Sequence, residues 1–186
     1  MSKSIEQHLE DAIRHYRAAQ YQEGLTACNN AVQLDPKCAR AYHGRGLIFV
    51  QQKKYEEAFD DYQKSCQLEP KNAKLHADIG ELLYILNDYE KSRLSYNEAI
   101  QLDRRYEAVY QRKTREFVDK ALNLNNRGLQ NEAITSLQQG LHFNPANERA
   151  TSILSTLQVK YTPKTKSSSD SSSLDYYPSG NNFPFS

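Results

Sequence analysis

The side chains best suited to chemistry are histidines and cysteines, and their spacing supports no reaction centre. The sequence pattern gives no reason to expect a Ser-His-acid or Cys-His catalytic grouping in the fold, and no glycine-rich phosphate-binding loop occurs. The cysteines are too widely and unevenly spaced to match any zinc pattern. We therefore expect no enzyme, no cofactor and no metal site. The residues considered are His8, His15, His43, His76, His142, Cys28, Cys38 and Cys66.

The composition narrows the class of protein further. The formal net charge is +1, so the whole molecule exerts no general attraction on nucleic acid or on an anionic membrane. An odd, sparse set of cysteines argues against a disulfide framework and fits a reducing compartment. The first ten residues are polar, and no apolar run approaches the roughly 18 residues that cross a bilayer. We expect a cytoplasmic protein.

A repeat with a period of about 34 residues organises the chain. Several columns keep this step, and within each unit apolar residues recur at intervals of three and four, which indicates helices. Segments 40–51 and 56–68 read as two helices joined by a turn at 52–55. Pro36 and Pro70 stand where one unit passes to the next. The columns are Tyr21, Tyr55 and Tyr89; Cys28, Tyr62 and Tyr96; Ala31, Ser65 and Ala99; Leu34, Leu68 and Leu102; Asp35, Glu69 and Asp103.

Small residues occupy one position in each predicted helix, Ala12, Gly46 and Gly80 in the first and Gly24, Ala58 and Ser92 in the second. Two helices can cross closely only where a side chain is nearly absent, and the neighbouring aromatic residue then fills the gap. This pattern of aromatic, small and proline positions resembles the tetratricopeptide repeat family. The resemblance covers about residues 5–161.

The resemblance implies an all-α fold, a right-handed superhelical stack of antiparallel helix hairpins with a C-terminal capping helix. We place repeats at 5–38, 39–72 and 73–106. A fourth, divergent repeat at 107–147 has its second-helix motif displaced by about two helical turns, so we expect a longer first helix. Segment 148–161 reads as the cap. Residues 162–186, rich in serine, read as a disordered tail whose aromatic residues could dock on the protein itself or on a partner.

In this family the first helices of the hairpins line a concave groove, and we expect that groove to bind a partner. By resemblance, the groove residues are Leu9, Ile13, Tyr16, Arg17, Arg40, His43, Leu47, Val50, Lys74, Asp78, Glu81 and Tyr84. An apolar floor with a mixed charged rim suits an amphipathic helix or an extended apolar peptide. The alternative is that some of these residues only pack against neighbouring helices.

Some family members grip a C-terminal carboxylate with lysine, asparagine and arginine side chains. The corresponding positions here are Leu9, Ile13, Gly44, Lys74 and Asp78, of which only Lys74 agrees. Without cationic and amide donors a carboxylate stays unpaired, so we exclude this mode.

The sequence therefore predicts an adaptor or scaffold that binds a protein or peptide partner, as a monomer or weak dimer. A small chaperone for a secreted or aggregation-prone client, or a non-catalytic regulatory subunit of an enzyme, are the alternatives. No small-molecule substrate is expected. Nucleic acid is not expected either, because acidic residues interrupt the basic run in 103–115.

Overall fold

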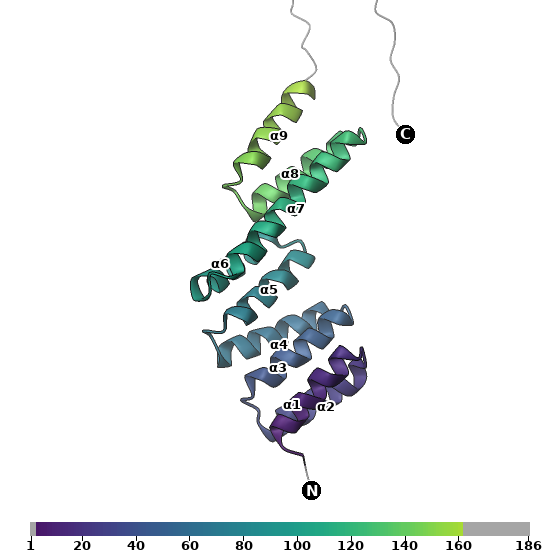
Figure 1. The fold of residues 1–186 in the computed structure, drawn as a ribbon, viewed down its shortest axis with the longest axis vertical. Helices are drawn as coiled ribbons and strands as arrows, with labels where there is room; N and C mark the ends of the chain where they lie inside the picture. Colours follow the sequence, from purple (N-terminus) through teal and green to yellow (C-terminus); the bar gives the residue numbers. More distant parts are fainter. Residues whose placement is uncertain (1–2, 162–186) are drawn as a thin grey trace, which may run out of the picture.

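The computed structural model describes residues 3–161, with the backbone alone at 160 and 161, and this part of the chain contains helices and no strand. The predicted disordered tail lies outside the described residues. Successive helices pair as hairpins that stack in one direction from α1 to α9 (Figure 1). The helices are α1 (Ile5–Arg17), α2 (Tyr21–Leu34), α3 (Ala39–Gln51), α4 (Tyr55–Leu68), α5 (Ala73–Ile85), α6 (Tyr89–Leu102), α7 (Tyr106–Asn126), α8 (Gln130–Phe143) and α9 (Glu148–Tyr161).

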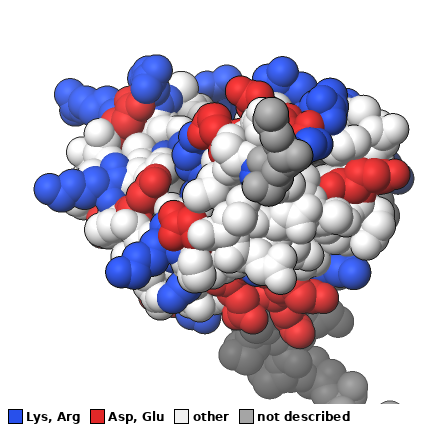
Figure 2. All heavy atoms as spheres, turned by 90° about the horizontal axis from the view of Figure 1, so that it is seen from below, with Lys and Arg blue, Asp and Glu red and all other residues white. Residues whose placement is uncertain are grey.

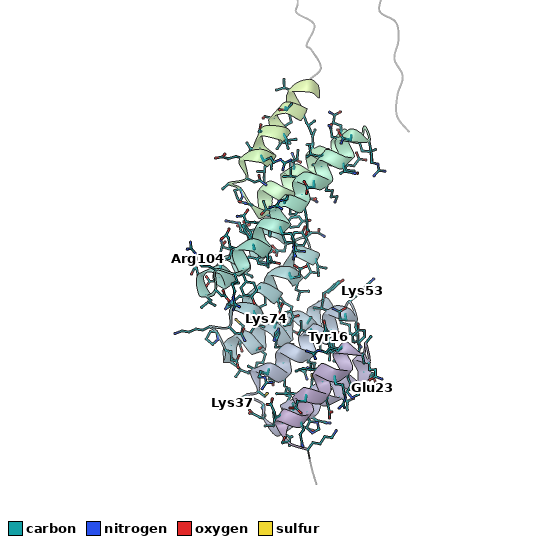
Figure 3. All side chains as sticks on the ribbon, viewed as in Figure 1. Tyr16, Glu23, Lys37, Lys53, Lys74 and Arg104 are labelled. Carbon is teal, nitrogen blue, oxygen red and sulfur yellow. The ribbon has the colours of Figure 1, made fainter. Side chains whose placement is uncertain are left out.

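Each hairpin turns through one residue with a positive φ. In the first three hairpins these are Ala19, Lys53 and Asn87, which follow one another at the repeat step, and in the fourth it is Gly128. A left-handed residue just beyond a helix is a common way to satisfy the last carbonyl groups and reverse the chain. Lys53 lies at one edge of the stack, opposite Lys37 in a loop that joins two hairpins (Figure 3).

The small residues allow the two helices of a hairpin to touch. A Cβ atom built on Gly46 would lie 2.6 Å from the ring of Tyr62, and one on Gly80 would lie 2.9 Å from the ring of Tyr96. Both tyrosines are buried. The Ser92 hydroxyl donates a hydrogen bond of 2.6 Å to the Gly80 carbonyl across the same contact. The aromatic and small columns of the sequence are thus the packing surfaces of the hairpins.

Helix α7 has 21 residues, against 13 in α1, α3 and α5. Its first half lies beside α6, and Tyr110 together with the mid-helix Phe117 contacts Tyr96 and Phe143. Its second half pairs with α8 through Val118 and neighbouring residues. The two additional turns let α7 pack against α6 with one part and against α8 with the other. Aromatic rings fill the space between α6, α7 and the end of α8, and the ring centroids of Tyr110 and Phe143 are 4.9 Å apart.

Helix α9 packs on α8 and contributes Ala150 and Leu157 to the last core cluster. Over the part of the chain that the structure describes, the predicted all-α stack of helix hairpins is confirmed. The right-handed twist stays a prediction.

Candidate functional site

The first helices of the four hairpins, α1, α3, α5 and α7, form one surface of the stack, which we call the A face. Side chains link each of these helices to the next. The linked residues are about one repeat apart in sequence, as in the pairs Glu6–Arg40 and Tyr16–Gln51. Tyr16 lies where α1 meets α3 (Figure 3). The A face holds eleven of the twelve predicted groove residues at its surface, and they divide into a polar and an apolar set.

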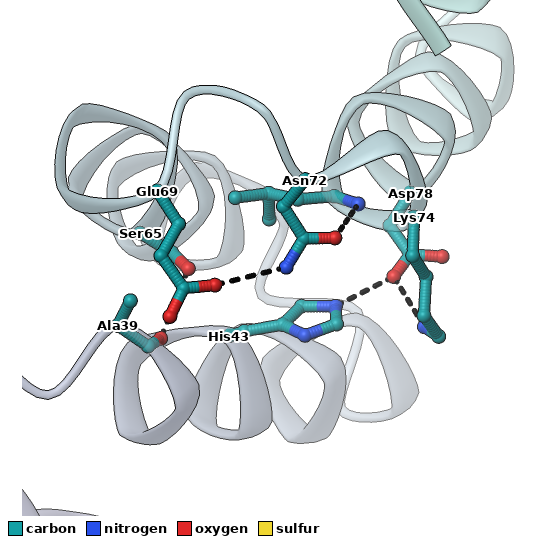
Figure 4. A network of polar contacts seen from close by, with 8 residues as sticks. Ala39, His43, Ser65, Glu69, Asn72, Lys74 and Asp78 are labelled. Atoms are coloured by element: carbon teal, nitrogen blue, oxygen red, sulfur yellow. Dashed lines mark hydrogen bonds and ion pairs between the residues drawn. The ribbon is translucent and has the colours of Figure 1, made fainter. Parts of the chain in front are cut away.

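The polar set lies toward the beginning of the helices. The Arg40 guanidinium donates two hydrogen bonds, of 3.0 and 3.2 Å, to the Glu6 carboxylate. One oxygen of Asp78 accepts hydrogen bonds of 2.6 Å from both His43 and Lys74, so that α3 is joined to α5 (Figure 4). Arg40, His43, Lys74 and Asp78 were predicted to line a groove, and the structure shows that Arg40 pairs with Glu6 and that His43 and Lys74 pair with Asp78.

Asp78 remains ionised because of these donors. Burial opposes its ionisation, but the hydrogen bonds and charges of His43 and Lys74 outweigh burial and lower the pKa of Asp78 below its ordinary value of 3.8. The carboxylate therefore holds the second and third hairpins together at neutral pH.

A second polar group joins α5 to α7. The Lys113 side chain is only 12% exposed, and its ammonium lies 2.9 Å from the Glu81 carboxylate and 4.4 Å from the centre of the Tyr84 ring. The Tyr84 hydroxyl donates a hydrogen bond of 3.3 Å to Glu116. Lys113 and Glu116 were not predicted as site residues, because each lies 32 residues after its partner on α5, slightly less than the repeat period of about 34.

The apolar set lies toward the ends of the same helices, and we call it the apolar strip. It consists of six side chains, none of them fully buried: Ile13, Tyr16, Leu47, Val50, Tyr84 and Ile85. Tyr16, Val50 and Tyr84 follow one another at the repeat step, as do Ile13 and Leu47. Ile13 is the most open, at 46% exposure. Arg17 is exposed beside it on α1. The strip ends in a depression of about 400 Å³ between α5 and α7, which Tyr84, Ile85 and Phe117 line with charged residues at its rim.

One predicted groove residue is not on the surface. Leu9 is 5% exposed and packs with Ala31 and Ala41, so the prediction that it forms part of an open floor is wrong. The equivalent residues Ala77 and Val118 are also buried, whereas His43, at the same position of α3, is partly exposed. The position is therefore sealed against neighbouring helices in α1, α5 and α7 but not in α3.

Charges of both signs are spread over the surface, and no face of one sign is seen from the α1 end of the stack (Figure 2). In the basic run noted in the sequence, Arg105 pairs with Asp103 and Lys113 with Glu81. Within residues 3–161, no three metal-ligating side chains come together, and no helix is long and apolar enough to cross a membrane. The three cysteines are unpaired thiols.

Comparison with known proteins agrees with this geometry. A family model described as TPR repeat matches residues 46–86, and one described as tetratricopeptide repeat matches residues 73–106. No curated protein matches the chain in sequence.

Among solved structures, the chain is similar to YrrB, described as a TPR protein with an unusual peptide-binding site. The identity is 20%, the match covers 82% of this chain and 75% of YrrB, and the TM-score is 0.51. The TPR domain of Arabidopsis OM64 is also 20% identical, with 58% of this chain and 92% of that domain covered and a TM-score of 0.55. Pseudomonas aeruginosa pilF is 18% identical, with coverage of 84% and 68% and a TM-score of 0.51. The matched models show that the chain contains tetratricopeptide repeats over residues 46–106, and the solved structures show that it shares their fold of stacked helix hairpins.

Proposed function

We propose that this protein is a non-catalytic adaptor that binds an amphipathic helix or an apolar peptide of a partner protein on the A face. The observation that carries the proposal is the apolar strip. Large apolar side chains stand partly exposed toward the ends of α1, α3 and α5, and Tyr16, Val50 and Tyr84 occupy the same position in three successive repeats. Proteins with such repeats are typically binding modules, and the similar protein YrrB is described as having a peptide-binding site.

The polar set explains why the ligand should be apolar along the strip. Glu6, Arg40, His43, Lys74 and Asp78 already satisfy one another, so a ligand gains little by competing for them. Burial of apolar surface, worth about 25 cal/mol per Å², then supplies most of the binding free energy. The polar set contributes rigidity, because it fixes the helices whose ends carry the strip.

The same reasoning supports the exclusion of a carboxylate clamp. Lys74 is the one clamp-type residue present, and its ammonium already pairs with Asp78 at 2.6 Å. A cytoplasmic location and a monomeric or weakly dimeric state belong to the same proposal. The three unpaired thiols support the location.

The proposal is tested with a ligand selected from a random peptide library on the wild-type protein. The affinity of that peptide is then measured by calorimetry for Ile13→Asp and for the control Leu34→Asp. Both residues are exposed aliphatics, but Leu34 lies on α2 and off the A face. We expect Ile13→Asp to weaken binding at least about tenfold, which is about 1.4 kcal/mol, because a carboxylate would be buried against an apolar ligand. Leu34→Asp should bind as wild type.

Equal affinities for the two variants would reject the A face as the binding surface. Circular dichroism of both variants should match that of the wild type, since neither residue is in the core. Leu47→Asp offers a second position in the centre of the strip. Leu47 is partly buried against the core, so its effect on binding is read only alongside a thermal melt.

A further inference from the structure

A second apolar surface lies away from the A face, between the second helices of two neighbouring hairpins. A depression of about 520 Å³ lies between α4 and α6, and residues of α5 also line it. Apolar residues line it: Phe59, Cys66, Ile79, Leu83 and Leu94. Leu94 is 53% exposed at its rim. The one charged residue in the lining is Lys91, whose ammonium pairs with Asp88.

The preceding junction, between α2 and α4, shows why this one is open. There the Arg45 guanidinium extends across the junction, donates two hydrogen bonds of 2.7 Å to Asp61 and a third of 2.7 Å to Asn29. Asp61 is 7% exposed in its side chain. One full repeat later, the same three positions hold Ile79, Ser95 and Gln63. The ion pair that fills the first junction is therefore replaced by an apolar side chain and a short hydroxyl.

The chain carries a segment whose chemistry matches this depression. Residues 176–186, which lie outside the described residues, contain no charged side chain and four aromatic ones, Tyr176, Tyr177, Phe183 and Phe185. A largely apolar depression, whose one charged lining residue already pairs with Asp88, favours such a segment over a charged one, because burial of an unpaired charge is costly.

The segment is also long enough to reach. The stretch of chain from the last residue of α9 to Tyr176 spans up to about 50 Å when extended. Helix α9 packs on α8, and α8 contacts α6, so the path crosses two helix-to-helix steps of about 8–10 Å each. Displacements back along α9 and along α6 add at most about 21 Å each, and the extended chain from α9 to Phe183, up to about 75 Å, covers this path.

We propose that residues 176–186 of the same chain dock, through their aromatic side chains, in the apolar depression between α4 and α6. This contact is independent of ligand binding on the A face. Arg45 and Asp61 fill the corresponding space between α2 and α4, whereas the space between α4 and α6 is open.

Cys66 provides a native probe of the docked state, because its thiol lines the depression. The full-length protein is treated with N-ethylmaleimide, and the alkylation rate of each cysteine is followed by peptide mass spectrometry. We expect Cys66 to react at least threefold more slowly in the wild type than in Phe183→Ser/Phe185→Ser. Neither change alters a residue of the described helices, so we expect the fold to be retained. Cys38, which is partly exposed and does not line the depression, is the internal control and should react equally in both proteins.

A synthetic peptide of residues 174–186, added to the Phe183→Ser/Phe185→Ser protein, should restore the slow rate at Cys66. The same peptide should not bind, by fluorescence anisotropy, when Ile79→Arg/Ser95→Asp is added to that protein, because the imported ion pair fills the depression. Leu34→Asp in the same background should leave peptide binding unchanged. Equal Cys66 rates in the wild type and the tail variant would overturn the proposal. Protection that disappears on dilution would overturn it too, since the occupant would then be a second copy.

Discussion

Replacing Gly46 by alanine tests the packing of the hairpins in a way that separates two opposing effects. A Cβ atom at Gly46 would lie 2.6 and 2.7 Å from ring atoms of Tyr62 and 3.3 Å from the carbonyl oxygen of Ala58. Tyr62 is 2% exposed and has little room to move. Overpacking of this kind costs about 1–3 kcal/mol. Against it stands the gain in helix propensity, up to about 1 kcal/mol, when alanine replaces glycine inside a helix.

Gly44, two positions earlier in the same helix, provides the matched control. A Cβ atom there would meet only the Cys28 sulfur at 3.4 Å, which is an acceptable contact. Because the propensity gain is similar at both positions, it cancels in the comparison. Gly46→Ala should therefore be less stable than Gly44→Ala by about 1–3 kcal/mol.

The assay is thermal unfolding followed by circular dichroism in the far ultraviolet. For a chain of this size, about 2–4 °C of Tm corresponds to about 1 kcal/mol, so Gly46→Ala should melt at least about 2 °C below Gly44→Ala. Gly44→Ala should melt at or above the wild type. If Gly46→Ala melted together with Gly44→Ala, Tyr62 would not be in contact with that position and the helix crossing described above would be incorrect.

The remaining predictions concern buried polar and aromatic groups. Arg45→Met should destabilise the protein by about 3 kcal/mol in urea unfolding, because Asp61 is left buried and unpaired; adding Asp61→Ser should recover most of the loss, and no recovery would show that the ion pair is not the cause. Because the pKa of Asp78 is lowered in the folded protein, the stability that its carboxylate contributes is present above about pH 4 and is lost as the pH falls further. Asp78→Asn should therefore lose less stability than the wild type between about pH 5 and pH 3. Parallel profiles of stability against pH for the two proteins would contradict this assignment. Burial raises the pKa of the Cys28 thiol to about 12, so this cysteine should resist alkylation at mildly alkaline pH until the protein unfolds. Phe143→Ala should cost about 3–5 kcal/mol in urea unfolding, because the ring joins α8 to the aromatic cluster of α6 and α7; a loss below about 1 kcal/mol would deny that role.

Much of the fold could be predicted because the repeat places the same residue types in the same contacts. Gly46 and Tyr62 are separated in sequence by the same interval as Gly80 and Tyr96, and each pair meets within its hairpin. The turn residues Lys53 and Asn87 follow the repeat step, although lysine gives no sign of a left-handed conformation. Local packing of this kind depends on sequence spacing alone, so it can be read without the structure.

The candidate site was less predictable, because it depends on how neighbouring hairpins stack. The position of Leu9 was assigned to the groove by resemblance, but here it is sealed between helices. The pairing of His43 with Asp78 links side chains about one repeat apart, and opposite polarity at that interval is a signal that could have indicated it. Lys113 and Glu81 could not be paired in advance, since the longer α7 shifts the register away from the repeat step.

The apolar strip as the ligand-binding surface is tested most directly by methyl NMR of the protein with the selected peptide. We predict that the methyl resonances of Ile13, Leu47, Val50 and Ile85 shift on binding, whereas those of Leu34 and Leu102, which are exposed on α2 and α6, do not. Shifts confined to Leu34, Leu102 or the depression around Leu94, with Ile13 and Ile85 unchanged, would contradict the account.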